Sequence, residues 1–75
     1  MRKPYVHSTV EQVIDLVRAQ GVMSVAEIAQ ALDISTASAR SKADGAVYRG
    51  ELVRDEYDDS GQPLHHEHWR YTEVR

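Results

Sequence analysis

The sequence predicts a small α+β domain in which three helices are followed by a two-stranded β-hairpin. Three features lead to this prediction. Apolar residues repeat with helical period, two of these segments open with the S-x-x-E pattern of a capping box, and a turn rich in Asp and Gly separates two strand-like stretches late in the chain. With 75 residues and no cysteine, the chain has one small core without disulfides or thiolate metal ligands to support it.

The first helix is predicted to begin at Ser8, after an N-terminal arm of residues 1–7, so that residues 8–75 form the folded domain. Ser8 and Glu11 fit a capping box, in which each side chain accepts a hydrogen bond from a free backbone N–H. Gly21 is expected to end the helix as a left-handed cap. The inward-facing positions are Val10, Val13, Ile14 and Val17, with Leu16 flanking them.

A short strand at residues 22–23 is expected to precede the second helix. Ser24 and Glu27 repeat the capping-box pattern and place the start of this helix. Its inward positions are Val25, Ile28, Ala29 and Leu32.

The third helix is predicted over residues 36–49, after a three-residue turn at 33–35 in which Ile34 points into the core and Ser35 caps the helix. Its inward residues are mostly small, which lets the helix lie close to its neighbours: Ala39, Ala43, Ala46 and Val47. Gly45 within it is expected to cost about 0.5–1 kcal/mol relative to Ala.

Gly50 ends this helix, and the hairpin follows, with strands at residues 51–57 and 64–72 joined by a turn at 58–61. Alternation along the second strand puts Trp69 and Tyr71 on one face. These two side chains are expected to pin the hairpin to the helices, since the chain has no Phe. The opposite face would carry His66, His68 and Arg70.

The charge of the chain is unevenly distributed, although its net value is only −3. Up to Gly50 there are six basic and five acidic residues, whereas from Glu51 onward there are three basic and seven acidic ones. The acidic excess therefore belongs to the hairpin. Arg49 and Arg54 are expected to pair with nearby acids such as Glu51 and Asp55.

The segment LDISTASARSKADGAVYRGELVRDE resembles the turn, recognition helix and first wing strand of the winged helix-turn-helix superfamily, and WRYTE resembles its second wing strand. The similarity covers residues 8–72, and the chain is also similar in size and layout to the very small bacterial regulators of pilus operons. The residues that carry the resemblance are Leu32, Ile34, Ser35, Ala39, Arg40, Ala43, Gly50, Leu52 and Val53. In such folds the short strand at 22–23 would pair with the hairpin.

The resemblance implies that the third helix enters the major groove of double-stranded DNA. The predicted DNA-binding residues are Thr36, Ala37, Ser38, Arg40, Ser41 and Lys42, with Asp44 also on the outward face. Arg40 suits a guanine contact, because a guanidinium donates two hydrogen bonds to O6 and N7. Its hydroxyl-bearing neighbours and Lys42 suit phosphates, and Arg2 and Lys3 on the arm would add a contact from a flexible tether. The alternative is that Arg40 and Lys42 are ordinary solvated residues of the helix surface and contact no DNA.

The wing departs from the pattern of the family, because Asp58, Asp59 and Ser60 stand at its tip where Arg or Lys is usual. Carboxylates are repelled by phosphates. Either this wing stays off DNA, in which case a homodimer reading two half-sites is expected, or the acidic hairpin docks a basic protein partner.

Other functions have weaker support in the sequence. His66 and His68 would share a strand face beside His65 and Glu67, but no further donor is placed to complete a metal site, so neither a metal nor a cofactor is expected. The alternative is an exposed face whose protonation near pH 6 offsets the acidic wing. No nucleophile and base pair or phosphate-binding loop suggests an enzyme. With no apolar run of bilayer length, a cytoplasmic protein is expected. The resemblance implies that it is a sequence-specific transcriptional regulator of phage, plasmid or operon type.

Overall fold

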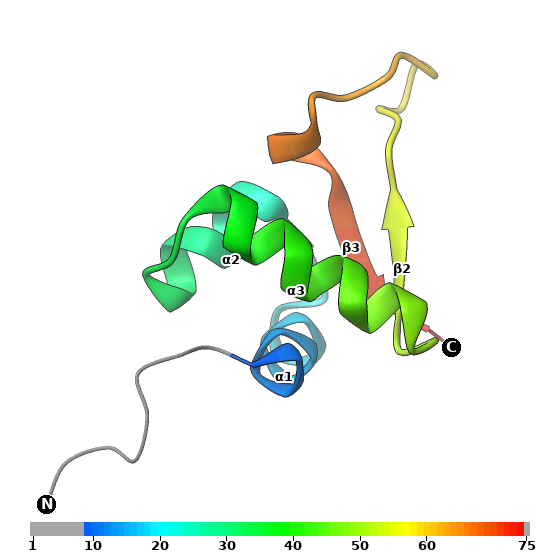
Figure 1. Ribbon diagram of the computed structural model, residues 1–75. Coiled ribbons are helices and arrows are strands. Elements are labelled where there is room, and N and C mark those ends of the chain that lie inside the picture. The colour runs from blue at the N-terminus through cyan, green and yellow to red at the C-terminus, as the bar shows by residue number, and fades with distance from the viewer. Residues whose placement is uncertain (1–8, 75) are drawn as a thin grey trace, which may run out of the picture.

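The computed structural model describes residues 9–74 as an α+β fold in which three α-helices pack against a three-stranded antiparallel sheet (Figure 1). The predicted arm, residues 1–7, and Ser8 lie outside the described residues. The elements are α1 Val10–Gln20, β1 Val22–Ser24, α2 Val25–Leu32, α3 Thr36–Tyr48, β2 Leu52–Asp55, the 3₁₀ turn η1 His66–His68, and β3 Arg70–Glu73.

Both of the first two helices begin with a capping box. In α2 the predicted box is confirmed: Ser24 Oγ accepts from the backbone N–H of Glu27 at 3.1 Å, and Glu27 Oε1 accepts from that of Ser24 at 2.9 Å. In α1 the prediction was wrong by one residue, because Thr9 and Gln12 form the box. The segment STVEQ holds two overlapping candidates, and the helix uses the second.

Glycine and aspartate end the first two helices. Gly21 ends α1 with a positive φ of 94°, although its ψ of −66° lies outside the left-handed helical region that was expected. Asp33 ends α2 in the left-handed conformation, with φ 56° and ψ 50°, which Asp adopts more readily than most residues. This sharp turn brings α3 against α2 as predicted, and Ser35 Oγ accepts from the backbone N–H of Ser38 at 3.1 Å to cap α3.

The small inward face of α3 packs closely on its neighbours. Ala39, Ala43 and Ala46 are fully buried. Gly45 was expected only to weaken the helix, but a Cβ added there would lie 3.3 Å from Val10 Cγ2. The missing side chain therefore lets α1 approach α3, which offsets the low helix propensity of glycine.

The sheet has three strands, one more than the two-stranded hairpin of the predicted fold class, and the third is β1, whose expected pairing with the hairpin is confirmed. The strand order is β1-β3-β2, and Tyr71 at the centre of β3 is opposite Met23 on one side and Arg54 on the other. Tyr71 is fully buried and is the largest such side chain of the core. Trp69 packs against the same core and is partly buried, as expected of the residues that pin the hairpin.

Both hairpin strands are shorter than predicted: β2 covers Leu52–Asp55 instead of 51–57, and β3 covers Arg70–Glu73 instead of 64–72. Pairing near the loop ends at the isolated bridge between Tyr57 and Pro63, and β3 does not begin until Arg70. Proline has no N–H with which to extend the ladder. The histidine segment between them forms η1, so the alternation predicted for His66 and His68 on a strand was wrong.

None of the helices within residues 9–74 has the length and apolar character that a bilayer span requires.

We expect Ser35→Ala to lower the free energy of unfolding by about 1 kcal/mol, because the N–H of Ser38 loses its capping acceptor. In a domain of this size such a change lowers Tm by roughly 4–8 °C. Ser35→Asp, which retains a capping oxygen, is the control and should stay close to the wild type in urea unfolding. Equal loss in both variants would contradict the capping role.

Candidate nucleic-acid interface

The predicted DNA-binding residues lie together on the first half of α3. Ala37 and Ser41 are exposed, and the other four members of the set, Thr36, Ser38, Arg40 and Lys42, are partly exposed. The buried residues Ala39, within this set, and Ala43, directly after it, hold another face of the helix against the core. The helical period therefore leaves a polar surface on α3, and Figure 1 shows α3 crossing in front of β2 and β3.

The two cations of this face differ in their surroundings. Lys42 Nζ donates to Ser38 Oγ at 3.1 Å, one turn earlier on the same helix. Arg40 makes no hydrogen bond or ion pair with any of the described residues. Its five guanidinium donors remain available to a ligand.

The other arginines in the described part of the chain are all paired with carboxylates. Arg18 contacts Glu51 and Glu73, Arg49 contacts Glu11, Arg54 contacts Asp44 and Glu56, and Arg70 lies near Asp55 and Asp59. The expectation that Arg49 and Arg54 pair with acids was thus right in kind, but Glu51 and Asp55 are not their partners. Across residues 9–74, Arg40 and Lys42 are the two Lys or Arg side chains without a carboxylate partner.

Asp44 was placed on the outward face of α3, but it points to the sheet. One carboxylate oxygen, Oδ1, accepts from the Tyr71 hydroxyl at 2.6 Å and from Arg54 Nη1 at 2.8 Å. Burial, and then the hydrogen bond to Asp44, raises the pKa of the Tyr71 phenol above its ordinary value. The hydrogen bond to the same carboxylate raises the pKa of Arg54. Asp44 therefore belongs to the scaffold of the site.

Arg54 also covers Trp69, with its guanidinium carbon 4.4 Å from the ring centroid. This is a cation–π contact between β2 and the residue that precedes β3. Sequence reasoning missed the set of Asp44, Arg54, Trp69 and Tyr71, because its members come from α3, β2 and the end of the chain.

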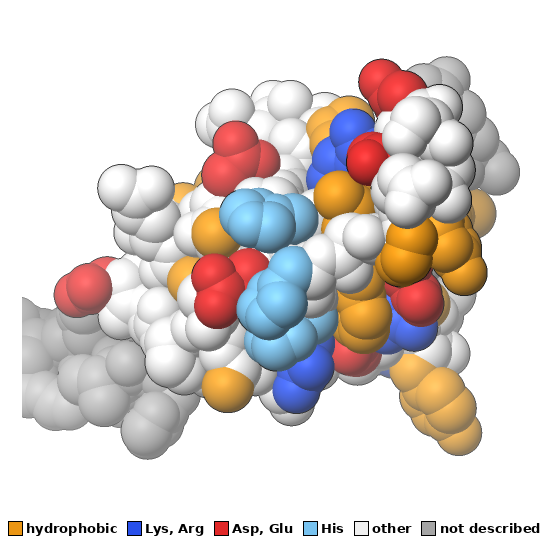
Figure 2. Space-filling view, turned by 90° about the horizontal axis from the view of Figure 1, so that it is seen from above, with side chains coloured by type: hydrophobic (Ala, Val, Ile, Leu, Met, Phe, Trp, Pro, Cys, Tyr) orange, Lys and Arg blue, Asp and Glu red, His pale blue; other side chains and the backbone are white. Residues whose placement is uncertain are grey.

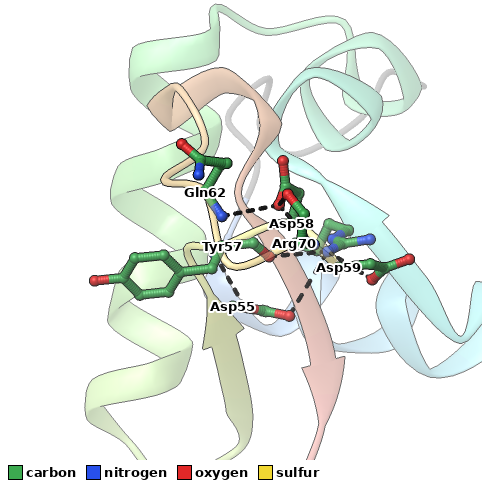
Figure 3. A network of polar contacts seen from close by, with 7 residues as sticks. Asp55, Tyr57, Asp58, Asp59, Gln62 and Arg70 are labelled. Carbon is green, nitrogen blue, oxygen red and sulfur yellow. Dashed lines mark hydrogen bonds and ion pairs between the residues drawn. The ribbon is translucent and has the colours of Figure 1, made fainter.

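The carboxylates of the wing are used mainly within the wing itself (Figure 3). Asp58 Oδ1 accepts from the hydroxyl and N–H of Ser60 and from the N–H of Gln62, and these bonds, that of the hydroxyl first, lower the pKa of Asp58. Arg70 Nη2 donates to the carbonyl of Tyr57 at 3.0 Å and lies 3.8 Å from the exposed Asp59. The acidic tip is thus partly neutralised by Arg70.

The histidines gather on the face shown in Figure 2, and η1, to which two of them belong, contacts both α2 and α3. The backbone N–H of Val25 donates to the carbonyl of Trp69 at 3.0 Å and joins η1 to the start of α2. His65, His66 and Glu67 form one cluster on this surface, and none of the three belongs to the predicted DNA-binding set.

Comparison with protein-family models, with curated proteins and with solved structures finds no match to this chain.

We expect Tyr71→Phe to lower the free energy of unfolding by about 1–2 kcal/mol, because a short hydrogen bond to a charged carboxylate is lost. The raised pKa of Tyr71 also makes the wild type lose stability as the pH rises above about 10, where the unfolded phenol ionises but the folded one keeps its proton.

Urea unfolding between pH 7 and 11 checks both statements. In Tyr71→Phe, the free energy of unfolding should fall less steeply above about pH 10 than it does in the wild type. Tyr48→Phe, which removes a hydroxyl from a side chain that is 95% exposed, should change the unfolding free energy by less than about 0.5 kcal/mol at neutral pH. If the free energy of unfolding depends on alkaline pH in the same way in Tyr71→Phe and in the wild type, this role for the phenol is contradicted.

Proposed function

We propose that this chain is a sequence-specific DNA-binding transcriptional regulator of the winged helix-turn-helix type, which places α3 in the major groove. One observation carries the proposal. Among the described residues, the two basic side chains free of carboxylates, Arg40 and Lys42, are both partly exposed on α3, where they flank the exposed positions Ala37 and Ser41. A protein surface that binds DNA needs cations that phosphates and base edges can reach.

The surroundings of the two side chains suggest different roles. Arg40 has no partner among the described residues and can direct two donors at guanine O6 and N7. The ammonium group of Lys42 is a compact charge that donates a hydrogen bond to Ser38, and a charge of this kind suits a phosphate contact. Thr36, Ser38 and Ser41 add hydroxyls for phosphate oxygens on the same face.

The wing contributes little to DNA binding in this proposal. Asp59 is fully exposed at its tip, and the one arginine near it is shared with Asp55 and with the carbonyl of Tyr57. A wing of this charge would be repelled by phosphates. Since one short helix face gives limited selectivity, we propose that a homodimer binds two half-sites about one helical turn apart.

The alternative is a protein-interaction module in which the acidic hairpin docks a basic partner. The acidic excess after Gly50 favours it. Against it, the carboxylates of Glu51, Glu56 and Asp58 already bind arginines or turn N–H groups of this chain. Few of the acidic side chains therefore remain free for a partner.

The test is binding to mixed duplex DNA by fluorescence anisotropy at about 50 mM salt, where phosphate contacts are strongest. We expect the Arg40→Ala, Lys42→Ala double variant to lose at least tenfold in affinity. Lys42→Ala alone should weaken binding to all sequences similarly and reduce the slope of log K against log salt by about 1.

The control is the Arg18→Ala, Arg49→Ala double variant, which makes the same change in net charge at two paired arginines outside this face. It should retain affinity within about threefold if location rather than total charge decides binding. The proposal fails if the wild type does not bind at low salt, or if both double variants lose affinity equally.

A further inference from the structure

We propose that His65, His66 and Glu67 form a binding site for a divalent transition metal ion of the Zn²⁺ type. Each residue offers one ligand atom, and the three atoms lie within 4.8 Å of one another. Imidazole nitrogen and carboxylate oxygen are ligands that Zn²⁺ takes in proteins, usually with water in the remaining position when three come from the protein. This proposal is independent of DNA binding.

The 3₁₀ turn is what brings these donors together. On an extended strand, His65 and His66 would point to opposite faces. At the start of η1, where His65 is the N-cap, the ring centroids of His65 and His66 are only 4.2 Å apart, with an interplanar angle of 32°. The carboxylate of Glu67 follows in the same turn, so one short segment presents all three donors to the same region of the surface.

The rigidity of the site comes from the core beside it. The ring of His66 makes an edge contact with Trp69, at a centroid distance of 6.3 Å, and Trp69 is packed against the core and covered by Arg54. The half-buried carboxylate of Glu67 makes no hydrogen bond or ion pair with the described residues. A half-buried charge beside two imidazoles and without a cation of its own is stabilised when a metal ion binds.

Only a small rearrangement is needed to close the site. Ligand atoms in a tetrahedral zinc site lie about 3.4 Å apart, given bonds of about 2.0–2.1 Å. The donors must therefore approach one another by roughly 1.4 Å at most. Because His65 is exposed, rotation of its side chain can supply this movement.

His65 already accepts a long hydrogen bond, 3.3 Å, from the backbone N–H of Glu67 to Nδ1. When Nδ1 accepts, the neutral imidazole carries its proton on Nε2. If the metal ion binds Nδ1, it displaces the backbone N–H of Glu67 from this nitrogen. If the metal ion binds Nε2, the imidazole proton moves to Nδ1, which can then no longer accept from Glu67. Metal binding should therefore shift the NMR signal of the Glu67 amide.

The experiment is titration of the untagged full chain with Zn²⁺, followed by calorimetry and by amide NMR. We expect one ion per chain, a shift of the Glu67 amide, and at least a tenfold loss of affinity in His66→Ala and in Glu67→Gln, since loss of even an outer-shell group commonly costs 10–100-fold. All three positions are on the surface turn, so circular dichroism should show an unchanged fold.

His68→Ala is the matched control, because it removes an imidazole from the same turn but outside the group of three donors. It should retain the affinity within about threefold. The proposal is overturned if no binding occurs up to about 1 mM Zn²⁺, corresponding to a binding free energy of roughly −4 kcal/mol. It is equally overturned if His68→Ala weakens binding as much as His66→Ala does.

Discussion

The carboxylate of Asp44 joins the two layers of this small domain. Through one oxygen it accepts from the buried Tyr71 of β3 and from Arg54 of β2, while its backbone belongs to α3. The rotation of α3 about its own axis is thereby fixed relative to the sheet. With Ala43 and Ala46 facing the core, the remaining polar face must point outward. The partial exposure of Arg40 and Lys42 thus depends on a contact that the same helix makes one turn after Arg40.

The charges of the domain fall into two groups with different consequences. Arginines that follow the sheet or the ends of helices, such as Arg18 and Arg49, are paired across elements, and each exposed pair contributes about 0–1 kcal/mol. Arg54 differs, because it combines ion pairs with a cation–π contact to Trp69. These pairings leave the free cations on α3. The lack of carboxylate partners for its cations, rather than the number of basic residues, distinguishes α3 from the rest of the described surface.

Local signals in the sequence predicted most of the fold. The capping box of Ser24 and Glu27, the turn before Ser35 and the small face of α3 were all found correctly, because each depends on residues within one or two turns. The length of β3 could not be predicted, since alternation does not reveal that pairing is interrupted after Pro63. The role of Asp44 was missed for a related reason: its partners lie 10 and 27 residues away, and sequence spacing does not show where β2 and β3 cross α3.

The acidic composition of the chain is a weaker argument against DNA binding than it first suggests. At physiological salt, charges separated by more than about 8 Å along the surface are largely screened from each other. A phosphate near α3 therefore responds chiefly to Arg40 and Lys42 and little to distant carboxylates. Several of those carboxylates are also engaged, as Asp58 is by Ser60 and Gln62 at the wing tip. The net charge of the chain includes carboxylates whose field is screened before it reaches a ligand at α3. The position of the unpaired cations is therefore a better guide than net charge to what this surface binds.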